Sequence, residues 1–241
     1  MKPPPSRTAF YDVGGGTGGL RDWVTLLHPP YTLWHLSYVA IGAAVVPHLV
    51  LWRLGGTLLA FFLAVGIGAH ALDELHGRPL GTGIGSGVLI AAAVVSIGAA
   101  MAMGLAYGGL RMLPLVLIGG LFAVGYNLEL AGGFLHTDLG FAVTWGGFPV
   151  LVGAYAQHWT VPPAAWVAAV AAIAMSLGQR SLSTPVRALR RRVAMASVQI
   201  TWRDGTQREY GRADLLAPVE RALRAFAWAV SALAVALVLA R

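Results

Sequence analysis

The chain has 241 residues, of which 57% are apolar and only 11% are charged, and its mean hydropathy is +0.68. So few polar side chains cannot cover a water-soluble globule of this size, and the composition therefore predicts an integral membrane protein. The formal net charge is +7, and cysteine is absent, which excludes disulfides, thiolate metal sites and cysteine nucleophiles.

Basic residues are almost all arginine, because Lys2 is the single lysine among 17 Lys and Arg. Together with the abundance of Ala and Gly, this usage is typical of a GC-rich prokaryotic genome and predicts the prokaryotic cytoplasmic (inner) membrane as the location. The first thirty residues lack the charged start, apolar core and cleavage site of a signal peptide. We therefore expect the N-terminus to be retained.

Apolar runs long enough to cross a bilayer, which takes about 20 residues, occur seven times. They cover residues 31–51, 55–75, 84–107, 109–129, 137–156, 160–178 and 217–240. We expect an all-α integral membrane protein of about seven transmembrane helices around a cytosol-facing cavity. The predicted division is a cytosolic N-terminal segment (1–30), a six-helix transmembrane domain (31–178), a basic cytosolic segment (179–216) and a C-terminal transmembrane helix (217–241).

Orientation follows from the cations, because short loops rich in Lys and Arg stay in the cytosol. A cytosolic N-terminus puts fourteen of the seventeen cations in the cytosol and leaves Arg53, Arg111 and Arg241 outside. The same choice places the acidic residues on or near the cytosolic face. The C-terminus is then outside, and any chemistry is expected at the cytosolic face.

The last predicted cytosolic segment combines a basic run, which begins at Arg187, with a hairpin pattern. Residues 198–202 alternate apolar and polar side chains, and Asp204-Gly205 follows as a two-residue turn signal. The pattern predicts a small surface β-hairpin. Asp214 is expected to cap the final helix, with Pro218 in its first turn.

Ionisable residues are densest where the second apolar run ends. His70, Asp73 and Glu74 have helical spacings of three and four, which predicts that they share one face and converge on one ligand. His76 is expected off that face, where the helix ends. A divalent-cation site and an interfacial salt-bridge cluster neutralised by Arg78 both explain the group.

A second polar cluster closes the fourth apolar run and precedes the fifth. Tyr126, Asn127 and Glu129 end the fourth helix, and His136 with Asp138 opens the fifth. A carboxylate at the end of an apolar helix is expected to face the protein interior rather than lipid. His35 is expected one turn inside the first helix at the same depth, so three helices could share one pocket.

These motifs resemble the UbiA superfamily of intramembrane prenyltransferases. The likeness covers about residues 28–192 and rests on the acidic motif from His70 to Leu80 with its Arg-Pro-Leu, the polar motif from Tyr126 to Glu129, a glycine-rich fifth helix with Trp145-Gly146-Gly147, and the shared helix directions. It implies that acids and Mg²⁺ hold an isoprenoid diphosphate in a cytosol-facing cavity.

The resemblance also implies roles for individual residues. Asp73, Glu74 and Glu129 are the implied catalytic acids, and Arg78, Tyr126, Asn127 and Trp145 are implied substrate contacts. The family's second acidic motif has no counterpart here, because residues 178–185 contain no acid. Arg180 and Arg187 are therefore expected to clamp the phosphate directly.

Two other functions remain open. The histidines and carboxylates suit iron or zinc better than Mg²⁺, so a non-haem metal protein could use His35, His70, His76 and His136 with the acids. A non-catalytic membrane subunit would dock its basic segment on anionic lipid. The expected partners are membrane lipid and an isoprenoid or quinone-like ligand, with no nucleic acid.

Overall fold

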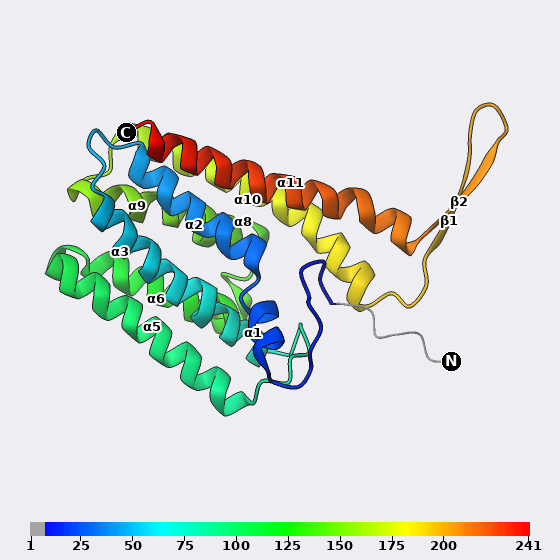
Figure 1. The fold of residues 1–241 in the computed structure, drawn as a ribbon, viewed down its shortest axis with the longest axis horizontal. Coiled ribbons are helices and arrows are strands. Elements are labelled where there is room, and N and C mark those ends of the chain that lie inside the picture. Colours follow the sequence, from blue (N-terminus) through cyan, green and yellow to red (C-terminus); the bar gives the residue numbers. More distant parts are fainter. Residues whose placement is uncertain (1–7) are drawn as a thin grey trace.

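The structure is a computed structural model that describes residues 8–241, and it is a helical bundle with one two-stranded hairpin (Figure 1). Lys2 and Arg7, two of the cations used to orient the chain, lie outside the described residues. The elements are α1 Leu20–Leu26, α2 Pro29–Ala44, α3 Leu51–Phe61, η1 Phe62–Ala69, α4 His70–Leu75, α5 Ser86–Gly108, η2 Gly109–Arg111, α6 Leu113–Asn127, α7 Leu130–Gly133, α8 Asp138–Phe141, η3 Ala142–Gly147, α9 Phe148–His158, α10 Pro163–Arg191, β1 Ser197–Thr201, β2 Gln207–Gly211 and α11 Arg212–Leu239.

Five helical stretches of the described chain are long and apolar enough to cross a membrane: Leu51–Leu75, Ser86–Arg111, Asp138–His158, Pro163–Arg191 and Arg212–Leu239. The predicted count of seven is not confirmed. The runs at 31–51 and 109–129 form α2 and α6, which have 16 and 15 residues and are therefore only about 24 and 22 Å long. Both helices lie within the bundle beside the longer ones (Figure 1).

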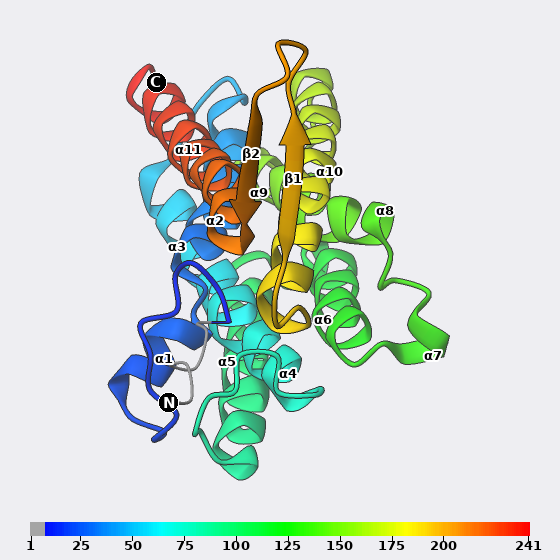
Figure 2. The same ribbon diagram turned by 90° about the vertical axis from the view of Figure 1, so that its right-hand side faces the viewer.

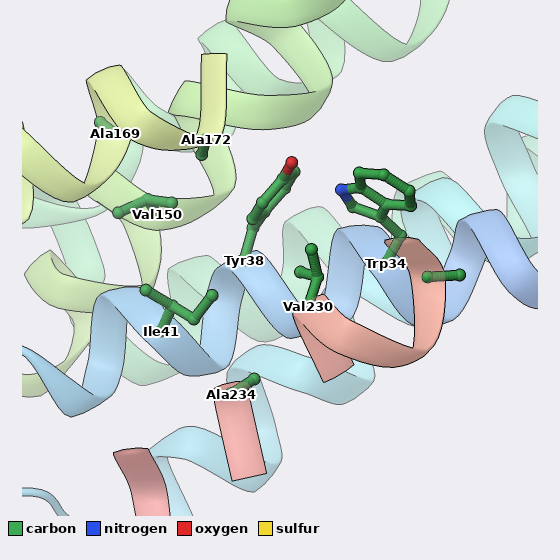
Figure 3. Close-up of a cluster of buried hydrophobic side chains, with 9 residues drawn as sticks. Trp34, Tyr38, Ile41, Val150, Ala169, Ala172, Val230 and Ala234 are labelled. Atoms are coloured by element: carbon green, nitrogen blue, oxygen red, sulfur yellow. The ribbon is translucent and has the colours of Figure 1, made fainter. Parts of the chain in front are cut away.

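Helix α2 lies in the centre of one half of the bundle, between α9 and α11, and small residues let the helices approach. A Cβ on Gly42 would lie 2.0 Å from the carbonyl oxygen of Val150, and one on Gly153 would lie 2.2 Å from that of Val39. Within a membrane the hydrophobic effect does not drive helices together, so close backbone contact of this kind is a main source of packing energy. Figure 3 shows the buried cluster around α2, in which Trp34 and Tyr38 lie near Val230 of α11 and Ile41 lies near Val150 of α9.

Two of the spanning stretches are interrupted by π-helical segments that face the interior. In Leu51–Leu75 the segment is η1, and in Asp138–His158 it is η3. The wider π-helical turn leaves backbone carbonyls free for other donors, and such segments are frequent at functional sites. Here the Gly66 carbonyl faces the ring Nδ1 of His70 at 3.2 Å, and the Trp145 carbonyl faces Nδ1 of His35 at 2.8 Å.

The predicted hairpin is present, and it projects from the end of the bundle where α10 ends and α11 begins (Figures 1 and 2). Strands β1 and β2 pair antiparallel with Thr201 opposite Gln207. The turn is one residue longer than predicted, because Trp202 pairs with Thr206 and Gly205 has a φ of +85°. The side chain of Asp204 supports the turn by accepting from both donors of Thr206 at 2.9 and 2.7 Å.

Much of the segment predicted as a soluble loop, residues 179–216, is helical. Helix α10 continues to Arg191, and α11 begins at Arg212, five residues before the predicted start. Asp214 was expected to cap the helix with Pro218 in the first turn. Its carboxylate does accept from the backbone N–H of Gly211 at 2.9 Å, but Asp214 itself lies in the first turn, and Pro218 lies in the second. With 29 and 28 residues, both helices are longer than a bilayer requires. An ion pair between Arg190 and Glu220 joins their extended ends.

The N-terminal segment crosses this same end, here called the hairpin end, whereas the C-terminus lies at the opposite end (Figure 1). Its glycine-rich loop is held by Asp22, whose carboxylate accepts from the N–H groups of Gly16, Gly18 and Gly83 at 2.7, 2.5 and 3.1 Å. Burial alone would raise the pKa of Asp22, but these backbone donors lower it below the usual value. Asp22 thus ties the N-terminus to the loop after α4.

Candidate functional site

A polar cavity of about 420 Å³ opens among the helix ends at the hairpin end of the bundle. Its wall is formed by the N-terminal segment, α2, η1, α4, the end of α6, η3 and the last three turns of α10. Most side chains predicted for a site line this cavity: His35, His70, Asp73, His76, Tyr126, Asn127, Glu129, His136, Trp145, Arg180 and Arg187.

Glu74 does not line the cavity, although it was predicted beside Asp73. Its side chain is fully buried on the other side of α4 and accepts from the N–H groups of Leu80 and Thr82 at 2.9 and 2.8 Å, and from the Thr82 hydroxyl at 2.9 Å. Successive helical residues are rotated by about 100°, so a cavity that faces Asp73 is turned away from Glu74. Glu74 therefore organises the loop after α4.

Arg78 and His76 also differ from their predicted places. Arg78 donates to the Ile84 carbonyl at 2.6 Å and to the Ser86 hydroxyl at 2.7 Å, so it neither lines the cavity nor neutralises the two acids. His76, expected off the polar face, does line the cavity, with its Nε2 3.9 Å from a carboxylate oxygen of Glu129. The side chains that line the cavity from α4 and its C-terminal end are thus His70, Asp73 and His76.

The predicted metal ligands are not gathered into one group. Nowhere between residues 8 and 241 do three His, Asp or Glu side chains converge as a metal centre would require. The nearest arrangement is Glu129 with His76 at 3.9 Å and His136 at 3.8 Å, and all three side chains are substantially exposed. With Glu74 engaged by backbone donors, the residues present do not fit a preformed Mg²⁺, iron or zinc site.

Three arginines of α10 form a stripe toward the cavity, because Arg180, Arg187 and Arg191 are spaced by seven and four residues. Arg180 is held by Asp138 at 2.8 Å and lies 3.3 Å from the Tyr126 hydroxyl. Arg187 contacts Thr184 at 3.5 Å, and Arg191 donates to the Thr8 carbonyl at 3.3 Å. Neither of these two forms an ion pair within 4.0 Å among the described residues, and Asp73 is the carboxylate that interacts with both electrostatically.

The balance of charge in the cavity is positive. Four arginines line it, namely the three of the stripe and Arg192, whereas the carboxylates are Asp73 and Glu129. A guanidinium that forms no close ion pair can bind phosphate or carboxylate through two parallel hydrogen bonds. The wall of α10 therefore favours an anionic group.

Several cavity residues were not predicted as site residues. Arg191 and Arg192 were assigned to lipid contact, yet the spacing of Arg191 from Arg180 places both on one helical face. Tyr11, His28, Tyr31 and Gln179 also line the cavity. No local pattern marks Tyr11, because the tertiary path of the N-terminal segment brings its ring 5.1 Å from that of His28 and 5.6 Å from that of Tyr31.

Burial sets the protonation of the two groups contributed by the N-terminal segment and the loop before α2. The pKa of Tyr11 is raised, because burial and the neighbouring Tyr31 disfavour the phenolate. The pKa of His28 is lowered well below its usual value, because burial and the neighbouring His70 disfavour the imidazolium. Both side chains are therefore neutral hydrogen-bonding groups at physiological pH.

A second, apolar cavity of about 190 Å³ runs among α3, α5, α6 and α9. Its wall is hydrocarbon and aromatic, with residues such as Phe61, Met101 and Phe148. Val65 and Trp145 belong to the walls of both cavities. The two cavities are therefore adjacent, with Val65 of η1 and Trp145 of η3 between them.

Comparisons of the chain with protein-family models, with curated proteins and with solved structures found no match.

Proposed function

We propose that this protein is a multi-pass membrane protein that binds a long-chain lipid of the isoprenoid type through a phosphorylated head group. The head group occupies the polar cavity, against Arg187 and Arg191, and the chain passes between Val65 and Trp145 into the apolar cavity. The single observation that carries the proposal is the shared wall: a basic cavity and an apolar cavity meet at the same two side chains. A ligand with one anionic end and one hydrocarbon end matches this order.

The arginine stripe supports the phosphate end of the proposal. Arg187 and Arg191 form no close ion pair among the described residues, and each guanidinium can bind two phosphate oxygens. Asp73 is one acid facing these two cations, so a ligand phosphate would add the anion that pairs with them directly. Phosphate is favoured over a single carboxylate because Arg187, Arg191 and Arg192 form no close ion pair among the described residues, whereas Arg180 is paired with Asp138.

The resemblance to the UbiA superfamily supports the same ligand class, and the distribution of cations favours a cytosolic position for the head group. The proposal is limited to binding. The metal-assisted prenyl transfer that the resemblance implies needs acids that hold Mg²⁺, and Glu74 is engaged elsewhere while Asp73 and Glu129 form no three-residue group with a neighbour. No reaction step is therefore assigned.

The test is equilibrium binding of a C15 to C20 isoprenyl phosphate to the whole protein in nanodiscs. Wild type is compared with Arg187→Gln/Arg191→Gln and with the matched control Arg203→Gln/Arg208→Gln, which removes two hairpin cations. We expect the cavity variant to lose at least about tenfold in affinity, the value of one charge-assisted hydrogen bond or more. Equal affinity of all three proteins would refute the proposal.

A further inference from the structure

Arg53 is a cation in the wall of the apolar cavity. Of the described residues that line this cavity it alone is charged, and its side chain is half-buried near the start of α3. Val65, which lies between the two cavities, follows Arg53 by twelve residues, or about 18 Å along the helix axis. Arg53 therefore lies at the side of the apolar cavity that is remote from the polar cavity.

Aromatic rings hold the guanidinium of Arg53 in place. Its Cζ lies 5.5 Å from the ring centre of Trp52 and 5.8 Å from those of Tyr107 and Trp159. Tyr107 and Trp159 are themselves stacked, with ring centroids 5.0 Å apart, and the Tyr107 hydroxyl donates to the Ala156 carbonyl at 2.9 Å. The cation is therefore positioned before a ligand binds, which lowers the entropy cost of binding.

The end of the bundle opposite the hairpin carries cations and no acid to balance them. The connections α2–α3, α5–α6 and α9–α10 lie at this end with the C-terminus (Figure 1). None of them contains Asp or Glu, and they are residues 44–51, 108–113 and 158–163. Arg111 also lies at this end, and its Cζ is 6.0 Å from the same Trp159 ring that contacts Arg53.

The charge of Arg53 calls for an anion. No described carboxylate lies within 4.0 Å of this guanidinium, which donates to the Gln157 carbonyl at 2.5 Å. A neutral carbonyl leaves the charge unbalanced, and a charge in an apolar wall is costly unless a counterion pairs with it. A guanidinium has five N–H donors, and its fork matches the two oxygens of a carboxylate or a phosphate.

The head groups of the surrounding bilayer do not account for Arg53 as they do for Arg111. Exposed cations near the ends of membrane helices ordinarily meet lipid head groups, and Arg111 is exposed. Arg53 is half-buried and lines a cavity inside the bundle, so an anion that pairs with it there has to enter the cavity. The rest of the wall is uncharged and mostly apolar, which favours an anion that carries a hydrocarbon chain.

We propose that the apolar cavity also binds a single-chain lipid whose anionic head group pairs with Arg53, near Arg111. A long-chain fatty acid is the simplest ligand of this class, because its carboxylate fits one guanidinium and its one chain suits a cavity of about 190 Å³. The inference does not depend on a phosphate at Arg187 and Arg191. Both ligands place their chains in the same cavity, so they exclude one another.

The experiment measures binding to the whole protein in phosphatidylcholine nanodiscs, in a background that carries Arg187→Gln/Arg191→Gln. This background removes the head-group contacts of the proposed function, so that the result reports on Arg53. The probes are palmitate, hexadecanol, which has the same chain length without the charge, and acetate, which has the charge without the chain. Binding to protein-free nanodiscs is subtracted.

Three substitutions are added to this background separately. Arg53→Gln removes the charge and keeps a donor for the Gln157 carbonyl, whereas Arg53→Lys keeps the charge and removes the planar fork. The control is Arg241→Gln. It removes a cation from the same end that donates to the Ala44 carbonyl at 2.6 Å and does not line the apolar cavity.

We expect the background protein and its Arg241→Gln variant to bind palmitate about tenfold more tightly than hexadecanol. Arg53→Gln should bind the two probes equally, and Arg53→Lys should keep part of the preference. Equal binding of both probes by the background protein overturns the anion site, and so does a palmitate preference that survives Arg53→Gln. Displacement of palmitate by acetate assigns the site to a free anion and overturns the lipid. The proposed function is tested with Arg187 and Arg191 in place, so it stands or fails separately.

Discussion

Val65 and Trp145 pack in one buried cluster and form the wall between the polar and the apolar cavity. Each lies in a π-helical segment, Val65 in η1 and Trp145 in η3, although the two residues are 80 positions apart in sequence. The irregular backbone of both spans therefore lies where the cavities meet. If a lipid chain passes this point, the size of residue 65 controls it.

Enlarging Val65 is expected to block the chain and to leave the head group contacts intact. Val65→Phe should weaken binding of a C20 isoprenyl phosphate by about tenfold, since added volume in a packed interior costs about 1–3 kcal/mol. Binding of a five-carbon isoprenyl phosphate should stay unchanged. The control is Val95→Phe on the exposed surface of α5, and equal weakening of the long and short ligands by Val65→Phe contradicts the proposed path.

Substitutions of the adjacent residues Asp73 and Glu74 are expected to have different effects on stability and on ligand affinity. Glu74→Gln replaces one accepting oxygen by a donor, so it leaves donors of Leu80 or Thr82 unpaired and should lower the free energy of unfolding by about 1–3 kcal/mol. Asp73→Asn should change ligand affinity with a smaller loss of stability, because the side chain lines the cavity. Denaturant unfolding in mild detergent measures the first effect. An Asp73 variant less stable than the Glu74 variant contradicts these placements.

Helix packing gives a matched pair of glycine substitutions. Gly42→Ala puts a Cβ 2.0 Å from the Val150 carbonyl oxygen, so α2 and α9 must separate, and we expect a destabilisation of about 1–3 kcal/mol. Gly55→Ala in α3 meets nothing within 4 Å and should be neutral or slightly stabilising, since alanine favours a helix. Thermal unfolding in one detergent compares them, and equal midpoints would show that α2 and α9 are not in backbone contact.

The lowered pKa of His28 predicts a loss of stability in weak acid. The unfolded chain takes up a proton on His28 below its ordinary pKa of 6.5, whereas burial keeps the folded protein from doing so. The stabilisation is therefore complete above pH 6.5 and declines as the pH falls toward the lowered pKa. Thermal midpoints at pH 7.5, 6.5 and 5.5 measure it.

The matched variant for this pH dependence is His28→Asn. The φ of His28 is +46°, and asparagine tolerates this left-handed conformation better than most residues. We expect the variant to lose less stability than wild type between pH 7.5 and pH 5.5. An identical decline in both proteins would assign the effect to other groups.

Patterns that depend on local composition predicted the mostly helical fold and the hairpin from sequence alone. The turn of the hairpin was predicted one residue too short, because Gly205 takes a left-handed conformation that allows a three-residue connection. The lengths of α2 and α6 were overestimated, because apolar loop residues such as Val46 extend each hydrophobic run beyond its helix.

The candidate site was predicted less completely, for a reason visible at α4. An ideal helix places Glu74 near His70, but the direction of the cavity is decided by η1 and by packing against α5, and the loop donors at Leu80 and Thr82 bind Glu74 on the far side. Contacts between distant segments are likewise absent from local patterns. Tyr11 reaches the cavity through the path of the N-terminal segment, which the hydrogen bond from Gly83 to Asp22 and the contact of Arg191 with the Thr8 carbonyl help to fix.

Photo-crosslinking by an isoprenyl phosphate with a diazirine at the far end of its chain tests the central claim most directly. We expect labelled peptides from the wall of the apolar cavity, in α5 and α6 around Met101 and Phe122. The label should be lost in Arg187→Gln/Arg191→Gln. Label spread over the exposed faces of α5 and α10, unchanged by the arginine variant, would contradict a phosphate-anchored chain inside the bundle.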